Sequence, residues 1–364
     1  MIPAEIYQDI YLLFILILAI IYLRNYRINK PLSKHPRSSV ATIVVMIIVI
    51  LYIGLRPLSD VFADMPQYYG YLQNFHNTTF RFNPVAENLI YDNLMMYLAC
   101  HNFPYPLFYL LIAAIYFVCY YTCIRKLFPK DTLIAYILFL SAFLTFSSST
   151  NGIKAGTATA IFMIAVANYN DAKIWIPFLL LSWGFHHAMH LPIAAFLCSK
   201  IVRNPKFYFF VWLFCLICAM AQITDFQTMF ADYTDEKGAS YLISDGEWGG
   251  KEGFRLDFVL YSAMPILVGW YSIIKRKFAD KYYKSILNIY MLTNGVWMLC
   301  MYMNYNNRLA ALSWGMYVVV MFYPLLRCAW PGNKNVTFRR IAWAHIGFTM
   351  AMHFIYYAFI HLNR

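Results

Sequence analysis

The chain alternates long apolar runs with short polar connections. Each run is long enough, or nearly so, to cross the hydrocarbon core of a bilayer as an α-helix. The runs occupy residues 7–23, 40–55, 106–124, 132–148, 152–168, 174–186, 190–203, 207–224, 256–274, 284–303, 308–326 and 341–361. They predict an all-α polytopic integral membrane protein with about 12 transmembrane segments, in which residues 1–364 form a single transmembrane domain.

Two of these segments are shorter than the rest. Residues 174–203 are too few for two full spans and too many for one, and they contain the sequence FHHAMHLP. Proline inside a helix removes a backbone hydrogen bond, and the flanking charges require an even number of crossings here. We therefore predict two short or tilted helices broken at Pro192, with one long helix as the alternative.

The composition excludes a soluble globule. Hydrophobic residues make up 61% of the 364 residues and charged residues only 13%, which is too little polar surface to coat a folded domain in water. The first apolar run is of spanning length and is followed by a strongly basic segment, so we expect it to remain as an uncleaved first helix.

Lysine and arginine are distributed unevenly among the connections. Six connections hold 21 of the 29 basic residues and only three acids. These connections are 24–39, 125–131, 168–173, 199–206, 275–284 and 327–340. By the positive-inside rule they face the cytoplasm, and 24–39, 275–284 and 327–340 are the main basic loops. The net charge of +12 therefore reflects topology and not nucleic-acid binding, since no basic stripe lies on a soluble segment.

Two long connections then fall on the outer side. Residues 56–105 contain an amphipathic segment, Val85–Ala99, which is expected to lie along the interface or over a cavity. Residues 225–255 are acidic, contain glycine and lack long apolar runs. We expect a lid or substrate-binding loop there, with disorder as the alternative.

Charged side chains cluster where the first outer connection leaves the membrane. The stretch GLRPLSDVFADMPQYYGY, residues 54–71, places Arg56, Asp60 and Asp64 just outside an apolar run. Charges this close to hydrocarbon are costly, and they are retained where they bind each other, bind a ligand or face a wet cavity. This loop is therefore interpreted as the rim of an active site.

Further polar residues follow on the same predicted side. Lys154 enters a helix near its N-terminus, where a cation opposes the helix dipole, so an anionic partner is expected; snorkelling to the interface is the alternative. Small residues at 155–160 permit close helix packing. His186 and His190 have a metal-pair spacing but no recognisable third ligand, so proton transfer or hydrogen bonding by His186, or a structural role, is favoured over a metal site.

Two more arginines complete the set. Arg255 and Asp257 stand where the long outer loop enters an apolar run, either as a phosphate-binding pair or as a plain salt bridge. Arg308 follows Asn307 at the start of another run. Several cations at headgroup depth suit a lipid-linked diphosphate and would stabilise it as a leaving group, while nearby carboxylates could activate a sugar hydroxyl. That chemistry is glycosyl transfer without a nucleotide, and no phosphate-binding glycine loop occurs in the chain.

The same segments resemble the EpsG-like, Wzy-type bacterial polysaccharide polymerases. GLRPLSDVFADMPQYY resembles the first outer-loop motif of that family, in which arginine precedes a small residue, an aspartate and tyrosines. The other four resemblances are NGIKAGTATAIFMIAVA to an NGIR-type helix start, FHHAMHLP to a His-x-Ser-x-x-x-Pro-like element, FRLDFVLYSAMP to an Arg-x-Asp-Phe segment and NRLAALSW to an Asn-Arg-Leu/Ile-Ala motif. The resemblance covers about residues 50–325, with Lys154 in place of arginine and Ala188 in place of a small hydroxyl residue.

The resemblance implies a GT-C-like helical bundle with an outer-face cavity, in a bacterial inner membrane and with its active site facing the periplasm. It implies a polymerase that moves a growing glycan from undecaprenyl diphosphate to the terminal sugar hydroxyl of another lipid-linked repeat, with no metal or cofactor. The expected partners are the undecaprenyl-diphosphate-linked oligosaccharide and the bilayer, with a chain-length regulator and a flippase as further candidates and no nucleic acid.

Our hypothesis gives each residue of the set a role. Asp64 is the first candidate for the base and His186 the second, while Asp257 orients Arg255. The diphosphate- and substrate-binding set is Arg56, Asp60, Tyr68, Lys154, Arg255, Asn307 and Arg308.

Three other functions remain open. A lipid-linked oligosaccharide flippase or transporter would need polar groups along its whole path, and a membrane O-acyltransferase would need a polar cluster on the inner side. The inner halves of the predicted spans carry almost no acids or cations, which disfavours both. A glycan ligase differs from a polymerase only in its acceptor.

Overall fold

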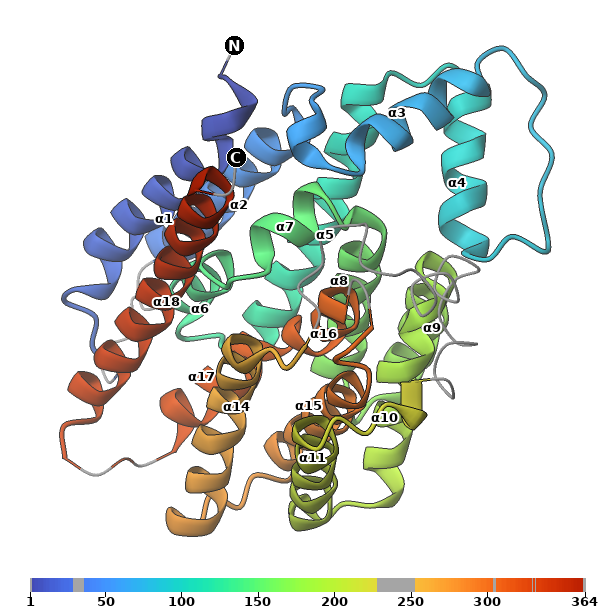
Figure 1. Cartoon of the computed structure of the whole chain (residues 1–364). Helices are drawn as coiled ribbons and strands as arrows, with labels where there is room; N and C mark the ends of the chain where they lie inside the picture. The colour runs from blue at the N-terminus through green and yellow to red at the C-terminus, as the bar shows by residue number, and fades with distance from the viewer. Residues whose placement is uncertain are drawn as a thin grey trace. The chain divides into compact units, whose positions relative to one another are not determined.

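The protein is described here from a computed structural model that covers residues 2–28, 36–227, 253–303, 306–328, 330 and 332–362, with the side chains of 36–39 and 356–362 left aside. Every regular element in these ranges is a helix (Figure 1). Contacts within the chain define two compact units, which are described separately. Unit 1 comprises Met1–Phe185 and Leu325–Arg364, and unit 2 comprises His186–Pro324.

Unit 1 contains the N-terminal helices and the C-terminal helix. Its elements are η1 (Ala4–Ile6), α1 (Tyr7–Leu23), α2 (Pro36–Gly54), η3 (Asp60–Phe62), α3 (Met65–Asn74), α4 (Leu89–Cys100), α5 (Tyr105–Leu127), α6 (Thr132–Leu140), α7 (Thr145–Thr150), α8 (Ile153–Ala167), α9 (Ala172–Phe185) and α18 (Lys334–Leu362). The closest packing joins α5 to α8 and α2, and α8 to α9. The mostly buried helix α8 therefore lies at the centre of this unit.

Unit 2 is built around α15. Its elements are η4 (His187–Met189), α10 (His190–Ile201), α11 (Pro205–Met220), α14 (Leu256–Trp270), the π-helical turn η5 (Tyr271–Lys275), α15 (Lys281–Leu299) and α16 (Asn306–Trp314). Helix α15 packs against α10, α11, α14 and α16. Helix α17 (Tyr317–Arg327) begins in unit 2 and ends in unit 1.

The chain is a helical membrane protein, as its composition predicts. Four helices in the described ranges are long and apolar enough to cross a bilayer: Ala4–Leu23, Tyr105–Leu127, Leu256–Lys275 and Asn306–Arg327. Several shorter apolar helices accompany them, including Val40–Gly54 and Ile153–Ala167. The count of about 12 crossings and the GT-C-like architecture stay predictions.

The span predicted at 132–148 is not one helix. Helix α6 ends at Leu140, and α7 begins only at Thr145. A helix end buried among apolar residues leaves carbonyl groups that need donors. Side chains supply them in three bonds: Tyr11 Oη to Leu140 O (2.7 Å), Thr145 Oγ1 to Phe139 O (2.6 Å) and His345 Nε2 to Leu138 O (3.1 Å). The polar side chains of α1, α7 and α18 thus make the break possible.

The break predicted at Pro192 is displaced. Helix α9 ends at Phe185 and α10 begins at His190, so the chain does form two helices. Pro192 lies in the first turn of α10, where a missing N–H costs nothing because that group has no intrahelical acceptor. The interruption is instead the extended residue His186 followed by the single turn η4.

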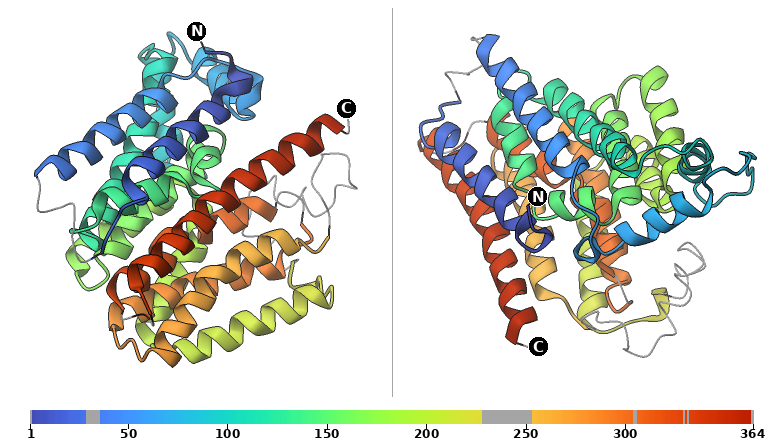
Figure 2. Two further views of the ribbon diagram at one scale, coloured as in Figure 1. Left: turned by 90° about the vertical axis from the view of Figure 1, so that its left-hand side faces the viewer. Right: turned by 90° about the horizontal axis from the view of Figure 1, so that it is seen from above.

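The first and last helices of the chain lie side by side in unit 1 (Figure 1 and Figure 2). His353 Nε2 on α18 lies 2.6 Å from Asp9 Oδ1 on α1. Helix α1 is also tied to α2, because the hydroxyls of Tyr7 and Tyr52 each donate to the other's carbonyl oxygen, at 2.6 and 2.8 Å. The two rings stack with their centroids 4.2 Å apart.

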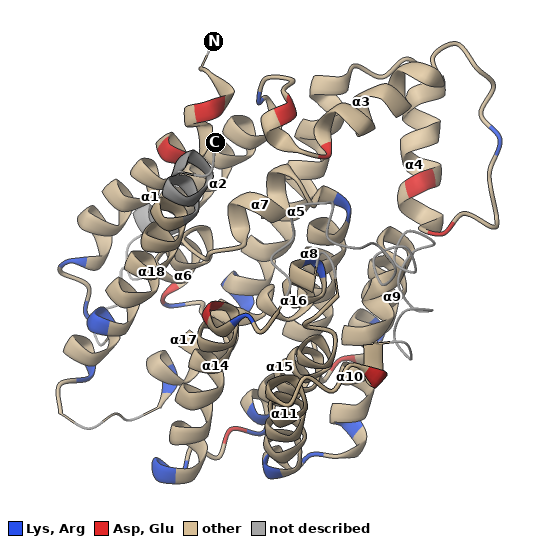
Figure 3. Cartoon of the chain, in the orientation of Figure 1, with Lys and Arg blue, Asp and Glu red and all other residues tan. Residues whose placement is uncertain are grey.

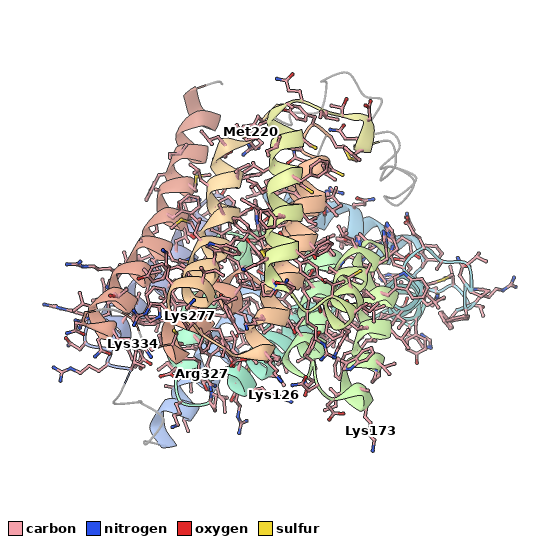
Figure 4. The ribbon with its side chains drawn as sticks, turned by 90° about the horizontal axis from the view of Figure 1, so that it is seen from below. Lys126, Lys173, Met220, Lys277, Arg327 and Lys334 are labelled. Atoms are coloured by element: carbon pink, nitrogen blue, oxygen red, sulfur yellow. The ribbon has the colours of Figure 1, made fainter. Side chains whose placement is uncertain are left out.

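Charge is segregated along the helices of unit 1. Figure 3 shows Lys and Arg at the lower ends of α1 and α18, and acids on η1 and near the upper end of α1. Lys126, Arg327 and Lys334 follow one another along one edge in Figure 4. Arg327 donates to Leu127 O at 2.7 Å, so this cation also binds the C-terminal end of α5. The arrangement matches the charge asymmetry on which the predicted orientation rests.

Candidate functional site

Arg56 is the most enclosed of the predicted site residues. Its side chain follows the end of α2 and is only 3% exposed. Nη1 donates to Ile53 O at 2.8 Å, in the last turn of α2, and Nη2 donates to Thr150 O at 2.9 Å, at the end of α7. The guanidinium therefore joins the C-terminal ends of two helices, where a cation is favoured by both helix dipoles.

Aromatic rings enclose this guanidinium. Its Cζ lies 4.6 Å from the ring centroid of Tyr109 and 5.4 Å from that of Phe62. Burial lowers the pKa of Arg56 to about 10, with the neighbouring tyrosines acting in the opposite direction, so the group stays protonated at neutral pH. Nε has no hydrogen-bond partner within the described part of the chain.

Tyr109 extends the connection from Arg56 to α3. Its hydroxyl donates to Met65 O at 2.8 Å, at the start of that helix. Asp64 is the residue before, in the N-cap position of α3, and it is half-buried. Asp60 is exposed in the preceding turn η3, whose own N-cap is Ser59. The backbone of the predicted rim is thus fixed by one buried arginine and one buried tyrosine.

Lys154 has an anionic partner within the protein. Its Nζ lies 3.0 Å from Oδ1 of Asp92 on α4, and 5.2 Å from the ring centroid of Tyr91. The side chains of Lys154 and Asp92 are 23% and 26% exposed. An anionic partner was expected because Lys154 lies at a helix N-terminus. In this structure that partner is the carboxylate of Asp92, which belongs to the amphipathic segment.

The first turn of α8 is held in place by close backbone packing. A Cβ atom on Gly156 would lie 2.3 Å from Ser148 O, so glycine is required where α7 meets α8. Beyond it, residues 156–160 are buried without exception. Close packing, predicted from the small residues at 155–160, is therefore observed at Gly156, where α7 meets α8.

Aromatic contacts join the start of α3 to the helix that carries Asp92. The rings of Tyr68 on α3 and Tyr91 on α4 meet edge to face with centroids 6.2 Å apart. Helices α3 and α4 also pack against each other. Within unit 1 the structure therefore brings together the loop at Arg56, the start of α3 and the Lys154–Asp92 pair.

Arg255 and Asp257 form the corresponding pair in unit 2. Nε and Nη2 of Arg255 donate to the two carboxylate oxygens of Asp257 at 3.0 and 2.7 Å. The guanidinium also covers the ring of Phe258, with Cζ 3.7 Å from its centroid. The arginine side chain is 15% exposed and the aspartate side chain 36%. Asp257 lies in the first turn of α14, where its charge suits the helix dipole, and it fixes the plane of the guanidinium.

Met301 links this pair to the start of α16. The backbone N–H of Arg255 lies 3.3 Å from Met301 Sδ, and Asn306 Nδ2 donates to Met301 O at 2.6 Å. Asn307 and Arg308 follow at once and are exposed. The structure thus places Arg255 near the start of α16, which carries the NRLAALSW motif; residues 304 and 305, just before this helix, lie outside the described ranges.

His186 begins the turn between α9 and α10. Its Nδ1 accepts a hydrogen bond from Ala188 N at 3.2 Å, and its ring stacks on that of His187 with centroids 4.9 Å apart. His190 Nδ1 lies 2.6 Å from His187 O. Among the described residues, no group of three or more His, Cys, Asp or Glu is placed to hold a metal ion. Most of the predicted lid, from 228 to 252, lies outside the described residues.

Asp92 is the site residue that the sequence analysis missed. It lies in the amphipathic segment predicted at Val85–Ala99. One signal was present: residues 85–99 contain acids but no lysine or arginine, so Asp92 had no basic partner in its own helix. The pairing with Lys154 spans 62 residues and could not be read from spacing.

The sequence and structure were compared with protein families, curated proteins and solved structures. No curated protein and no solved structure matches it. The family model described as the EpsG family matches residues 39–363. The match includes all five motifs and every predicted site residue, so the predicted resemblance is confirmed, and the chain belongs to the EpsG family.

Proposed function

We propose that the protein is a polysaccharide repeat-unit polymerase. It transfers a growing glycan from undecaprenyl diphosphate to the terminal sugar hydroxyl of another lipid-linked repeat, on the outer face of a bacterial inner membrane. The observation that carries the proposal is the family match over residues 39–363, which spans every predicted motif. The partly exposed cations Lys154 and Arg255, each paired with a carboxylate at a helix start, support it.

The reaction forms one glycosidic bond and breaks one bond between an anomeric carbon and a diphosphate oxygen. The acceptor hydroxyl attacks the anomeric carbon of the donor glycan, its proton passes to a carboxylate or imidazole, and the bond from that carbon to the diphosphate oxygen breaks. Asp64 is the first candidate for the base and His186 the second. The departing diphosphate carries the electron pair of the broken bond as negative charge, which cations placed beforehand stabilise.

The cations divide by accessibility. Lys154 in unit 1, and Arg255 and Arg308 in unit 2, have side chains that a ligand can reach, and each of them stays a candidate for binding the diphosphate. Asp257 orients Arg255 through its two hydrogen bonds. Arg56 as a direct diphosphate ligand stays a prediction without support, because Nη1 and Nη2 are engaged by backbone carbonyls; we assign it to holding the loop instead.

The remaining residues of the set belong to the sugar-binding part. Asp60, Tyr68 and Asn307 offer a carboxylate, an aromatic hydroxyl and an amide, the groups that bind sugar hydroxyls. A flippase remains the second candidate from another class, since it would use the same cations without breaking a bond. Turnover separates the two functions.

The experiment is polymerisation by the purified protein in nanodiscs, given synthetic undecaprenyl-diphosphate oligosaccharide repeats and no nucleotide sugar. A ladder of products on a gel supports the proposal. The ladder should be lost in Arg255→Ala and weakened in Arg255→Lys, because lysine keeps the charge but not the two parallel hydrogen bonds. Arg203→Ala, a substitution of an exposed arginine in a predicted cytoplasmic loop, is the control. Substrate crossing a proteoliposome membrane without any ladder would instead identify a transporter.

A further inference from the structure

The carboxylate of Asp92 makes two different kinds of contact. Oδ1 binds Lys154 Nζ at 3.0 Å. Oδ2 accepts from the backbone N–H and the side-chain amide of Asn88, at 3.1 and 3.3 Å. Asn88 is the N-cap residue of α4, so the second oxygen stabilises the start of that helix. The first oxygen instead joins α4 to α8.

The two contacts differ in how easily a ligand can replace them. The local bonds to Asn88 lie within one turn of chain and do not depend on Lys154. The ion pair is partly open to solvent, with side chains 23% and 26% exposed, and such pairs contribute little net stability. A phosphate or diphosphate group carries more charge and more acceptor oxygens than one carboxylate, so it competes well for the same ammonium group.

Helix α4 has a second attachment that remains when the ion pair opens. It packs on α9, where a Cβ on Gly184 would lie 2.5 Å from Ile90 Cδ1. Losing the bond to Lys154 would therefore free the side of α4 that faces α8 without detaching the helix. Arg56 differs from Lys154, because its side chain is buried and its hydrogen-bond partners are backbone carbonyl oxygens.

We propose that Asp92 is an exchangeable counter-ion of Lys154. It neutralises the lysine while the site is empty, and an anionic phosphate of the lipid-linked substrate takes its place and releases α4 from α8. The inference rests on the proposed function, because it assumes that Lys154 meets a phosphate. It gives Asp92 a positioning role that neither the sequence motifs nor the family match assigns.

The test compares equilibrium binding of undecaprenyl diphosphate in nanodiscs by wild type, Asp92→Asn and Lys154→Met. Asparagine keeps an acceptor for Asn88 and removes the competing charge, so Asp92→Asn should tighten binding about threefold to tenfold, while Lys154→Met should weaken it by about as much. Glu5→Gln, which removes an exposed carboxylate of the N-terminal turn, should leave the dissociation constant unchanged.

The sign of the change decides between the possible roles. Weaker binding by Asp92→Asn would overturn the proposal, since it would mean that Asp92 holds Lys154 ready for the ligand. Equal binding by all variants would also overturn it, because the ligand would then not use Lys154. If wild type does not bind the lipid at all, the proposed function fails first and the counter-ion role fails with it.

A second measurement follows the helix itself. Amide hydrogen exchange over residues 89–100 should rise when undecaprenyl diphosphate is added to wild type, because α4 loses its bond to α8. In Asp92→Asn the exchange should already be high without lipid and should change little on adding it. Exchange that falls in wild type on adding lipid would contradict release of α4, even where binding itself is observed.

Discussion

The guanidinium of Arg56 donates through Nη2 to the carbonyl oxygen of Thr150, the last residue of α7, at 2.9 Å. Its Nη1 does the same for Ile53 in the last turn of α2. One buried cation thus binds carbonyl groups at the ends of two helices. Thr150 is 94 residues from Arg56 in the sequence, and Ile53 is three residues from it. The loop bearing Asp60 and Asp64 begins at Arg56, so its position depends on these two hydrogen bonds.

Arg56→Met should lower the free energy of unfolding by about 2 to 5 kcal/mol, because two buried carbonyl groups lose their donor. Arg56→Lys should recover part of the loss, since an ammonium group can bind one carbonyl but lacks the fork that reaches both. Thermal unfolding in detergent measures both variants. Arg81→Met, at an exposed arginine of the same connection, is the control. Full stability with lost turnover would instead favour direct binding of substrate by Arg56.

The contact between α7 and α8 predicts a sharp difference between two nearby glycines. Gly156→Ala places a Cβ 2.3 Å from the backbone oxygen of Ser148, which cannot move away alone, and it should destabilise the protein by about 1 to 3 kcal/mol or more. Gly152→Ala meets no atom within 4 Å and should be tolerated. Equal stability of the two variants would show that α7 and α8 are further apart.

His345 should contribute to stability and not to chemistry. A carbonyl oxygen only accepts, so Nε2 must carry the hydrogen that bonds to Leu138 O. His345→Ala leaves the end of α6 short of a donor at a site only 3% exposed, and should cost about 1 to 3 kcal/mol. His345→Gln keeps a donor and should lose less. His101→Ala, an exposed histidine, provides the comparison in the same unfolding assay.

Asp131 gives a prediction with a defined pH dependence. Burial raises the pKa of this carboxyl, with opposing effects from the Tyr26 hydroxyl, Arg327 and Lys334. The folded state therefore binds the proton more tightly than the unfolded state, and stability falls as pH rises from about 3.8 through the raised pKa.

Asp131→Asn removes the loss of stability at rising pH and keeps an oxygen acceptor for the Tyr26 hydroxyl. Its melting temperature should exceed that of wild type at pH 7, and the difference should shrink as the pH is lowered towards 4. Asp131→Ala also loses the acceptor and should melt lower than Asp131→Asn throughout. A melting-temperature difference between Asp131→Asn and wild type that does not vary with pH would rule out this carboxyl as the source.

The base assignment predicts a loss of turnover without a loss of folding. Asp64 makes no side-chain cap of α3, so Asp64→Asn should fold normally and lower polymerisation by about 10²- to 10⁴-fold. His186→Ala tests the second candidate with the same gel assay and the same check of melting temperature. Normal ladders from Asp64→Asn, with loss in His186→Ala, would move the role to the histidine.

The local pattern of residues was enough to predict several parts of the structure. Apolar run length predicts helices, and glycine and other small residues predict the close contact at Gly156, because these are properties of neighbouring residues. The five motifs predicted the family, which the match over 39–363 confirms. The ion pair of Arg255 with Asp257 was within reach for the same reason, since the two lie in one turn.

Only the tertiary structure decided the rest. The end of α6 at Leu140 depends on Tyr11 and His345, which are 129 and 207 residues away from the carbonyls that they bind. The partner of Lys154 is Asp92 on another helix, and one of the two carbonyl groups that Arg56 binds belongs to Thr150, 94 residues away. Sequence determines which groups need a partner, because burial of an unsatisfied polar group is costly. Packing decides which partner each one finds, because that depends on which helices meet in space.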